Sequence, residues 1–531
     1  RSKNEPYVFY DGPPFATGLP HYGHIVASVM KDVVPRYFTM QGKRVERVWG
    51  WDCHGLPIEN IVEKELGTKS KKDIEELGVE KFNELCRSKV LSYVGEWQKT
   101  IHRLGRWVDM EHAYRTMDLG YMESVWWVFK QLWEKGLVYE DYRSMHICPR
   151  CETTLSQQEV SEGYQEVKDI SVFPKFKITK AKEKLGVEGD VYMIAWTTTP
   201  WTLPGNVALA VGAEIEYLVV KNFVEHNDSG KALYEHVLVS KDYFDNVDIS
   251  NPSNGFKFLF SDVSGSKETP TPASVVKSIK GSLLVDLKYE PLFPYYKETP
   301  NAFRVVAADF VTTEDGTGVV HIAPAFGDDD FQVGKREGIP LVQHVGMDGR
   351  FKSEVTDFAG QEVKPRSEDD KIRLSSDIAI VRYLQEHGLF FDKKNIQHTY
   401  PHCWRCDTPL LNYATSSWFV SVTKVKDAAL EEAKKINWSP EHIKEGRFGK
   451  WLEGARDWSI SRQRFWASVI PVWRCTVDSC KHTICFGSVA ELEKISGQSI
   501  TDIHKHIVDE VTFACDSCGG TMKRIPDVLD T

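Results

Sequence analysis

The sequence has no long hydrophobic run: no stretch of its 531 residues approaches the roughly 18 consecutive apolar residues of a membrane-spanning helix. Cysteine is sparse, because 11 cysteines in 531 residues are too few, and odd in number, for a disulfide scaffold. Basic residues are not in excess either, since 66 Lys and Arg stand against 76 Asp and Glu, for a net charge of −10. A uniformly basic nucleic-acid-binding coat is therefore excluded, although a local basic track is not.

Internal repeats, low-complexity tracts, Walker-type phosphate loops and Gly-x-Ser-x-Gly elbows are also missing. The composition, with 41% hydrophobic and 27% charged residues, is that of a globular protein and excludes a disordered or collagen-like chain. Residues Arg1 to Asn4 do not resemble a signal peptide, so we expect a cytoplasmic protein that is not bound to a membrane. At roughly 150 residues per domain, the length predicts three or four domains.

The spacing of the cysteines is more informative than their number. Three pairs lie three residues apart, where chance predicts about 0.2 such pairs, and a fourth pair is looser. Two such pairs can together bind one zinc ion tetrahedrally. The alternative roles for paired cysteines are a redox motif and simple burial as small hydrophobic side chains. Turn residues within and after the pairs favour metal binding, and the pairs are Cys148/Cys151, Cys403/Cys406, Cys515/Cys518 and Cys475/Cys480.

Two zinc sites follow from the order of these pairs. The Cys475/Cys480 and Cys515/Cys518 pairs are close enough in sequence to form one zinc-ribbon-like unit, although the wide spacing of Cys475 and Cys480 makes it the weaker candidate. The other two pairs would then share a zinc across 251 intervening residues. A zinc between such distant pairs would hold the neck of an inserted domain, which we place at about residues 160–398.

The remaining pattern predicts an α/β protein. A short strand at Tyr7–Tyr10, a helix at His21–Gln41 and a strand at Val45–Trp49 form the βαβ unit of a Rossmann-like parallel sheet, and another helix is expected at Lys424–Lys435. The inserted region alternates β-branched runs with turns, which predicts a mostly-β barrel. Its expected strands are Tyr192–Thr199, Tyr217–Val220, Leu283–Leu287, Phe303–Ala307 and Gly318–Ala323.

The segment from Asp11 to His24 joins the first strand to the first helix, where an open α/β sheet binds ligands and a helix N-terminus attracts phosphate. Gly23 permits close approach of a flat base, and His21 and His24 could donate hydrogen bonds to a polyphosphate. Taken alone, the two histidines are equally explained as surface residues of a capped helix.

The whole segment resembles the HIGH signature of class I aminoacyl-tRNA synthetases, in the form carried by the isoleucine-specific members of that family. The segment from Gly50 to Glu59 is similar to the same members, and the valine- and leucine-specific members differ at both places. Similarity continues in the expected order through four further segments, which are Ala195–Asn206, Gly316–Phe331, Tyr400–Pro409 and Asp457–Trp466.

The resemblance implies ATP-dependent activation of L-isoleucine, with Mg²⁺, and its ligation to tRNA(Ile). His21 and His24 would stabilise the ATP phosphates during in-line attack on the α-phosphorus, where catalysis is mainly positioning and charge stabilisation. Gly12, Pro13 and Asp52 would line the amino acid pocket, and Asp52 would hold the substrate ammonium. A loop-capping aspartate is the alternative for Asp52. The family also implies a monomer.

The resemblance further implies that the inserted domain edits. A pocket sized for isoleucine cannot exclude valine strongly, because one methylene is worth only about 1–3 kcal/mol, so a second site hydrolyses valyl-tRNA(Ile). Without the resemblance, the residues of that second site read as an ordinary strand and a solvated loop. They are Thr197, Thr198, Thr199 and Asn206 on one wall, His321 on the other, and Asp330, which would bind the ammonium group of valine.

Residues 441–464 carry six basic against four acidic side chains, a modest basic track. In the family this region lies near the tRNA acceptor end, so Arg462 and Arg464 are candidate tRNA contacts, and a solvated helix is the alternative.

The family frame divides the chain into 1–159 (first half of the catalytic domain), 160–398 (editing domain), 399–474 (catalytic domain, continued) and 475–531 (zinc-binding insertion and start of the second catalytic half). No KMSKS loop and no anticodon-binding domain are present in the sequence, so we expect a fragment of a larger enzyme. A valine-specific enzyme and a non-catalytic tRNA-binding relative are the alternatives.

Overall fold

The structure is a computed structural model that describes residues 5–68, 70–229, 231–247, 255–256 and 273–529. By internal contacts the chain divides into two compact units. Unit 1 consists of Arg1–Asp141, Cys151–Ser156 and Ser416–Thr531, and unit 2 consists of Tyr142–Arg150 and Gln157–Thr415. None of the described helices combines the length and the apolar character needed to cross a membrane.

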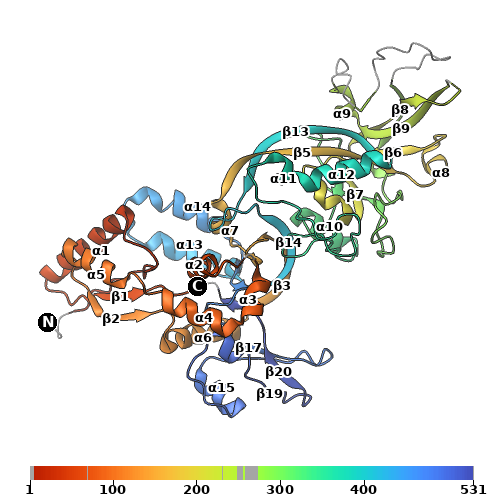
Figure 1. The fold of residues 1–531 in the computed structure, drawn as a ribbon. Coiled ribbons are helices and arrows are strands. Elements are labelled where there is room, and N and C mark those ends of the chain that lie inside the picture. Colours follow the sequence, from red (N-terminus) through yellow and green to blue (C-terminus); the bar gives the residue numbers. More distant parts are fainter. Residues whose placement is uncertain (1–4, 69, 230, 248–254, 257–272, 530–531) are drawn as a thin grey trace. The chain divides into compact units, whose positions relative to one another are not determined.

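The N-terminal part of unit 1 is mainly helical (Figure 1). A long helix, α1 (Tyr22–Met40), lies between the candidate HIGH segment and strand β1 (Val48–Trp51), which pairs in parallel with β2 (Asp109–Arg115). Further helices surround this pair, and they are α2 (Leu56–Leu66), α3 (Lys71–Leu77), α4 (Val79–Lys89), α5 (Val94–Leu104) and α6 (Leu119–Glu134). The structure thus confirms the predicted helix at His21–Gln41 to within one residue at each end.

An aromatic core holds this part together. Trp49 and Trp51 of β1 contact Trp97 of α5 edge to face, with ring centroids 6.3 and 6.1 Å apart. The same core includes Phe82 of α4 and Trp466, both fully buried. Buried aromatic rings contribute large apolar areas, and edge-to-face pairs add about 0.5–1.5 kcal/mol each. This packing fixes the loop between β1 and α2, which carries Asp52.

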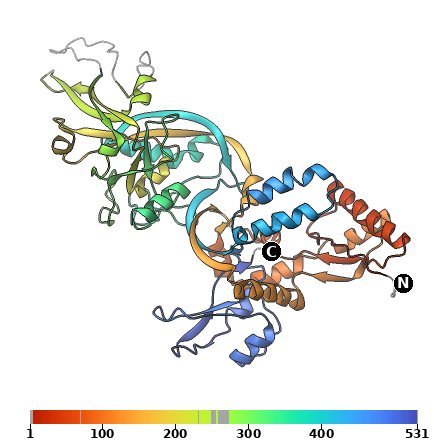
Figure 2. The ribbon, with the colours of Figure 1, turned by 180° about the vertical axis from the view of Figure 1, so that it is seen from behind.

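The remaining part of unit 1 contains small sheets and short helices (Figure 2). One four-stranded sheet has the order β18-β17-β20-β19 and packs its Trp473 and Met522 against Trp126 of α6. Its elements are β17 (Val472–Cys475), β18 (Thr483–Cys485), β19 (Phe513–Ala514) and β20 (Thr521–Arg524), with α15 (Val489–Ser496) and α16 (Lys505–Val508) beside them.

Helices α13 (Lys426–Lys435) and α14 (Arg447–Glu453) pack against each other in unit 1, and α13 confirms the helix predicted at Lys424–Lys435. The short elements here are η3 (Val422–Lys424), η4 (Glu441–Ile443), β4 (Thr153–Thr154), β15 (Trp458–Ser459), β16 (Ser461–Arg462) and β21 (Val528–Leu529). Strands β3 (Val138–Cys148) and β14 (Leu411–Val420) carry the chain from one unit to the other, in a sheet ordered β15-β14-β3-β4.

Unit 2 is built on a six-stranded sheet ordered β10-β8-β9-β6-β5-β13 and a three-stranded sheet ordered β11-β7-β12. The long strands β5 (Tyr164–Lys177) and β13 (Phe390–Pro401) run side by side as an antiparallel pair (Figures 1 and 2). The other strands are β6 (Val191–Ile194), β7 (Ala208–Val211), β8 (Glu216–His226), β9 (Ala232–Ser240), β10 (Ser274–Lys280), β11 (Arg304–Ala307) and β12 (Val319–Ile322).

The helices of unit 2 are short. They are α7 (Gln157–Ser161), α8 (Ala181–Leu185), η1 (Pro200–Gly205), α9 (Lys241–Asp245), η2 (Gly281–Leu283), α10 (Asp328–Arg336), α11 (Asp370–Arg373) and α12 (Ser375–Glu386). Four of the five predicted strands have counterparts here, at β6, β8, β11 and β12.

The predicted strand at Leu283–Leu287 is wrong. The chain there forms η2 and a turn, in which the Leu284 and Leu287 amides donate to the carbonyls of Gly281 and Leu284. Asp286 has φ +64°, a left-handed conformation that a strand does not contain. Leu284 and Leu287 are buried in a core whereas Leu283 is 72% exposed, so the segment shares the apolar composition of a strand but not its conformation.

The predicted strand at Tyr7–Tyr10 is also not formed. Within the described residues the segment makes one parallel bridge, between Pro6 and Arg44, and Tyr10 is 92% exposed. A strand needs a hydrogen-bonded neighbour, and beyond this bridge the described part of the chain supplies none here.

Candidate functional site

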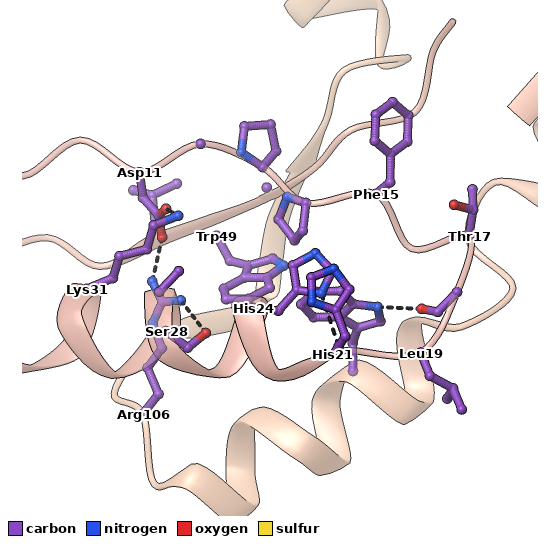
Figure 3. Close-up of a pocket in the computed structure, with 18 residues that line it drawn as sticks. Asp11, Phe15, Thr17, Leu19, His21, His24, Ser28, Lys31, Trp49 and Arg106 are labelled. Atoms are coloured by element: carbon purple, nitrogen blue, oxygen red, sulfur yellow. Dashed lines mark hydrogen bonds and ion pairs between the residues drawn. The ribbon is translucent and has the colours of Figure 1, made fainter. Parts of the chain in front are cut away.

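A pocket of about 520 Å³ lies in unit 1 over the N-terminal end of α1 (Figure 3). Its walls come from the segment Asp11–Leu19, the first three turns of α1 and strand β1, with Trp97 and Arg106. Gly12, Pro13, His21 and His24, four of the residues singled out in the sequence, line it together. The volume is typical of a small-ligand site, and the helix N-terminus favours an anionic ligand.

His21 and His24 also begin the helix on which they lie. The His21 Nδ1 accepts a hydrogen bond from the Gly23 amide at 3.1 Å, and the His24 Nδ1 accepts from the His21 amide at 3.2 Å. The same rings therefore form a capping box and line the pocket, and their contact with ATP phosphates stays a prediction. With Nδ1 accepting, each neutral ring carries its proton on Nε2 and is a hydrogen-bond donor there.

Charge and packing keep these rings in place. The His24 pKa is lowered by burial and by the positive potential of its neighbours His21 and Lys31, which favours the neutral ring. The two imidazoles stack with centroids 3.7 Å apart, and Trp97 contacts His24 edge to face at 4.8 Å while its indole N–H donates to the Gly18 carbonyl. The pocket therefore presents two oriented Nε2–H donors.

Two cations lie at the opposite end of the same pocket. Asp11 forms ion pairs with Lys31 and Arg106, and Arg106 also donates to the Ser28 hydroxyl at 3.2 Å (Figure 3). The Arg106 guanidinium lies over the Trp49 ring, 5.0 Å from its centroid. Asp11 thus neutralises part of the positive charge of Lys31 and Arg106, two cations that could also bind an anionic ligand.

Asp52 is held beside the pocket segment but is not one of the residues that line the pocket. Its amide donates to the Pro14 carbonyl at 3.0 Å, and the Thr116 hydroxyl lies 3.5 Å from its carboxylate. Burial raises the Asp52 pKa to about 6, although backbone amides of His54 and Cys53 donate to the carboxylate. A partly desolvated carboxylate of this kind is suited to bind a cation.

A second cluster of predicted residues lies in unit 2, along η1 and β12. The His321 Nε2 lies 2.8 Å from the Thr202 hydroxyl, and its Nδ1 lies 3.2 Å from the Asn206 amide nitrogen. Hydroxyl contacts of 3.3 Å connect Thr202 to Thr199 and Thr199 to Thr197. The structure therefore joins four predicted editing residues in one hydrogen-bond chain, and Thr198 lies partly exposed between two of them.

His321 is neutral in this cluster, because burial and the nearby His344 lower its pKa to about 3. Asp330 lies in the first turn of α10, and its carboxylate accepts from the Ala323 amide at 2.8 Å, at the end of the strand that carries His321. Burial raises the Asp330 pKa to about 6. Asp330 thus belongs to the same edge of the three-stranded sheet as His321.

The structure places Arg462 and Arg464 differently from the sequence expectation. Each is only 4% exposed, and the Arg464 guanidinium pairs with Glu59 and Glu63 and donates to the Cys151 carbonyl at 2.8 Å. A contact with a tRNA phosphate needs an exposed cation, which neither side chain supplies in this structure. The exposed cations of the basic track are Arg447, Lys450 and Arg456.

The eight paired cysteines form two clusters that could each hold a metal ion. The ligand atoms of Cys148, Cys151, Cys403 and Cys406 lie within 4.8 Å of one another, as do those of Cys475, Cys480, Cys515 and Cys518. The Sγ atoms of Cys148 and Cys406 lie 3.4 Å apart, as do those of Cys475 and Cys518. A tetrahedral zinc with bonds of about 2.3 Å needs sulfurs about 3.8 Å apart, so both sets fit.

Sequence reasoning missed Thr202 and Tyr289. The Thr202 hydroxyl connects His321 to the threonine run, and the Tyr289 hydroxyl donates to the Asn206 carboxamide oxygen at 2.7 Å. Thr202 lies three residues after the run Thr197–Thr199, and this closeness in sequence was a signal that could have identified it. Tyr289 lies 83 residues from Asn206, and no local pattern marks it.

The family model of class I tRNA synthetases of the isoleucine, leucine, methionine and valine group matches residues 1–531. The chain belongs to this family.

Curated relatives define the similarity more closely. The chain is 48% identical to an isoleucine–tRNA ligase of Treponema denticola over all of its length, and 45% identical to those of Treponema pallidum and Bdellovibrio bacteriovorus over 100% and 99% of its length. These alignments cover 47%, 47% and 46% of the relatives. The chain thus spans about half the length of the curated relatives it matches.

Proposed function

We propose that the chain is the activating and editing part of an isoleucine–tRNA ligase. Its activity would be ATP-dependent activation of L-isoleucine, ligation to tRNA(Ile) and hydrolysis of mischarged valyl-tRNA(Ile). The observation that carries the proposal is the agreement of two independent features. Relatives named isoleucine–tRNA ligase match the chain from end to end, and His21, His24, Gly12 and Pro13 line one pocket.

In the activation step, the carboxylate of isoleucine attacks the α-phosphorus of ATP and pyrophosphate leaves. The Nε2–H groups of His21 and His24 would donate to phosphate oxygens on which charge develops. Because the cap fixes both rings before substrate binds, no side-chain ordering is needed during reaction. Mg²⁺ would accompany ATP and neutralise phosphate charge. Asp52 would hold the isoleucine ammonium.

In the editing step, water hydrolyses the ester between valine and the terminal ribose of the tRNA. Asp330 would bind the α-ammonium group, and Thr197, Thr198, Thr199, Asn206 and His321 would form the walls of the site. His321 is poorly suited to act as a general base, because burial lowers its pKa to about 3 and both ring nitrogens have protein partners. Its role would be to position hydroxyl groups.

The finer domain assignment is part of the same proposal. Residues 1–159 and 399–474 would form a Rossmann-like catalytic domain, 160–398 a β-barrel editing domain, and 475–531 a zinc-ribbon-like insertion. The bridge between Trp196 and Val320 connects the segment after β6 to β12, and so links the two sheets of unit 2 as a barrel requires. The parallel pairing of β1 with β2 supports the Rossmann-like sheet.

Zinc is the metal that the two thiol clusters suit best. The ion would supply structural cross-links and no chemistry at either active site, since four thiolates leave no open position. The tRNA would approach through the exposed cations Arg447, Lys450 and Arg456, and Arg462 and Arg464 would support that region from inside. We expect a cytoplasmic monomer.

Hydrolysis of valyl-tRNA(Ile) by the complete protein tests the editing part of this proposal. The wild-type protein should hydrolyse valyl-tRNA(Ile) and spare isoleucyl-tRNA(Ile). Asp330→Asn should reduce valyl-tRNA hydrolysis by about 100-fold, because the ammonium loses its ionic partner. An Asp328→Asn variant, altered at an exposed residue of the same helix, is the matched control. Equal loss in both variants would contradict the role of Asp330.

A further inference from the structure

Tyr289 lies behind the candidate editing cluster and touches it through one atom. The side chain is 3% exposed, and its ring packs edge to face on Phe176 and Phe303, with centroids 5.3 and 6.0 Å away. Its own amide donates to the Phe303 carbonyl, so backbone and ring are both held. The hydroxyl donates to the Asn206 carboxamide oxygen at 2.7 Å.

The hydrogen bonds around Asn206 fix the orientation of its amide. The Asn206 nitrogen donates to the Ala208 carbonyl at 2.9 Å, and the Asn206 oxygen accepts from Tyr289. In the flipped orientation two oxygens would face each other at Ala208. The second N–H of the amide therefore points to the His321 Nδ1, 3.2 Å away.

This orientation fixes the tautomer of His321. Because Nδ1 accepts from Asn206, the neutral ring carries its proton on Nε2, and this proton is donated to the Thr202 hydroxyl oxygen at 2.8 Å. The Thr202 hydroxyl in turn donates to the Thr199 carbonyl at 2.8 Å. The other tautomer would reverse the Thr202 hydrogen bond and leave the Thr199 carbonyl without it.

The same hydrogen bonds determine which hydroxyl donates and which accepts in the threonine run. With its own proton on the Thr199 carbonyl, Thr202 accepts from the Thr199 hydroxyl at 3.3 Å. The Thr197 hydroxyl accepts from the Thr199 amide at 3.1 Å, and its O–H donates to the Thr199 hydroxyl oxygen at 3.3 Å. Each hydroxyl thus donates in one defined direction. That direction is set by the series of hydrogen bonds that begins at Tyr289.

We propose that Tyr289 is a positioning residue of the hydrolytic site, which holds Asn206 so that His321 stays in its Nε2–H form and the threonine hydroxyls keep one orientation. The inference rests on the proposed editing function. Tyr289 does not touch substrate, and it acts only through Asn206. Loss of its hydroxyl leaves a buried amide oxygen unpaired, which removes one of the two bonds that fix the amide.

The test is Tyr289→Phe in the complete protein, with Tyr400→Phe as the matched control. Tyr400 is another tyrosine of unit 2. Its hydroxyl donates to the backbone carbonyl of Leu410, which lies outside this cluster. Two readouts are compared: the kcat and KM of valyl-tRNA(Ile) hydrolysis, and the 15N chemical shifts of His321 in histidine-labelled protein. The His321 signals are assigned from a His321→Gln variant. Asn206→Asp, which forces an acceptor toward Nδ1, gives the shifts of the other tautomer.

We expect Tyr289→Phe to lower kcat by roughly 10-fold with KM within about twofold, and to give His321 shifts between those of the wild type and Asn206→Asp. Tyr400→Phe should keep both wild-type values. Unchanged His321 shifts in Tyr289→Phe, or an equal fall of kcat in both tyrosine variants, would overturn the proposal. If the wild-type protein hydrolyses no valyl-tRNA, the editing function fails, and the His321 shifts still decide the role of Tyr289.

Discussion

At the scale of single residues, burial disfavours the charged form of two groups of the editing cluster, His321 and Asp330. It lowers the His321 pKa to about 3 and raises the Asp330 pKa to about 6. His321 therefore stays neutral over the whole range in which most enzymes work. Asp330 becomes protonated as the pH falls through about 6, and a protonated carboxyl cannot pair with an ammonium ion.

The pH dependence of editing follows directly. The kcat/KM of valyl-tRNA(Ile) hydrolysis by the complete protein should be level above about pH 7 and should fall as the pH is lowered through 6, as Asp330 takes up its proton. The measurement is the hydrolysis rate between pH 5 and 8, corrected for uncatalysed deacylation. Asp330→Asn should lack this fall. A profile that is level down to pH 5 in the wild type would contradict the assignment.

Arg464 provides a second prediction at this scale. Its guanidinium satisfies two buried carboxylates, Glu59 and Glu63, and Glu59 also accepts the amides of Phe465 and Trp466. Arg464→Met would leave two buried carboxylates without a cation and should lower the free energy of unfolding by about 3–5 kcal/mol. Arg447→Met, at an exposed position of the same track, should change it by less than about 0.5 kcal/mol. Urea denaturation measures both, and equal effects would contradict the buried ion cluster.

At the scale of elements, the sequence predicted helices well, whereas apolar runs did not distinguish a strand from a buried turn. The helix expected at His21–Gln41 is α1, because its apolar period and its stop at Gly42 are encoded within the segment. The strand expected at Leu283–Leu287 is a turn, because buried turns and strands share apolar composition. The basic track gave no sign that Arg464 is buried, since its partners lie about 400 residues away.

The candidate sites show the same division. His21, His24, Asn206 and His321 belong to contiguous motifs, and the structure brings them to two clusters as the sequence suggested. Tyr289 carries no motif, and only the packing of the chain between Phe176 and Phe303 places its hydroxyl against Asn206. Residues that act through another side chain are therefore the part of a site that sequence reasoning does not reach.

The short helix η1 provides a prediction at the element scale. Gly205 ends η1, and a Cβ atom there would lie 2.2 Å from the His344 Nδ1. Gly205→Ala should therefore displace η1, which carries Thr202, and should cost about 1–3 kcal/mol of stability with at least a 10-fold loss of valyl-tRNA hydrolysis. Gly95→Ala, where no heavy atom lies within 4 Å, is the control. Wild-type hydrolysis by Gly205→Ala would contradict the account of η1.

At the scale of the whole molecule, metal content is the clearest prediction. The two thiol clusters should each bind one zinc, so elemental analysis should give two equivalents per chain. Because Cys518 is exposed whereas Cys148, Cys151 and Cys403 are buried, a chelator should remove the zinc of the second cluster first. Less than one equivalent in carefully prepared protein would contradict both sites.

The central claim is specificity for isoleucine, and amino-acid-dependent ATP–pyrophosphate exchange by the complete protein tests it most directly. Isoleucine should support exchange with a kcat/KM roughly 10- to 200-fold above that of valine, the range that one methylene gives in a hydrophobic pocket, for which this pair of amino acids is the standard example. His24→Ala should lower the rate by about 100-fold for both amino acids. A preference for valine or leucine, or no exchange with any amino acid, would contradict the account.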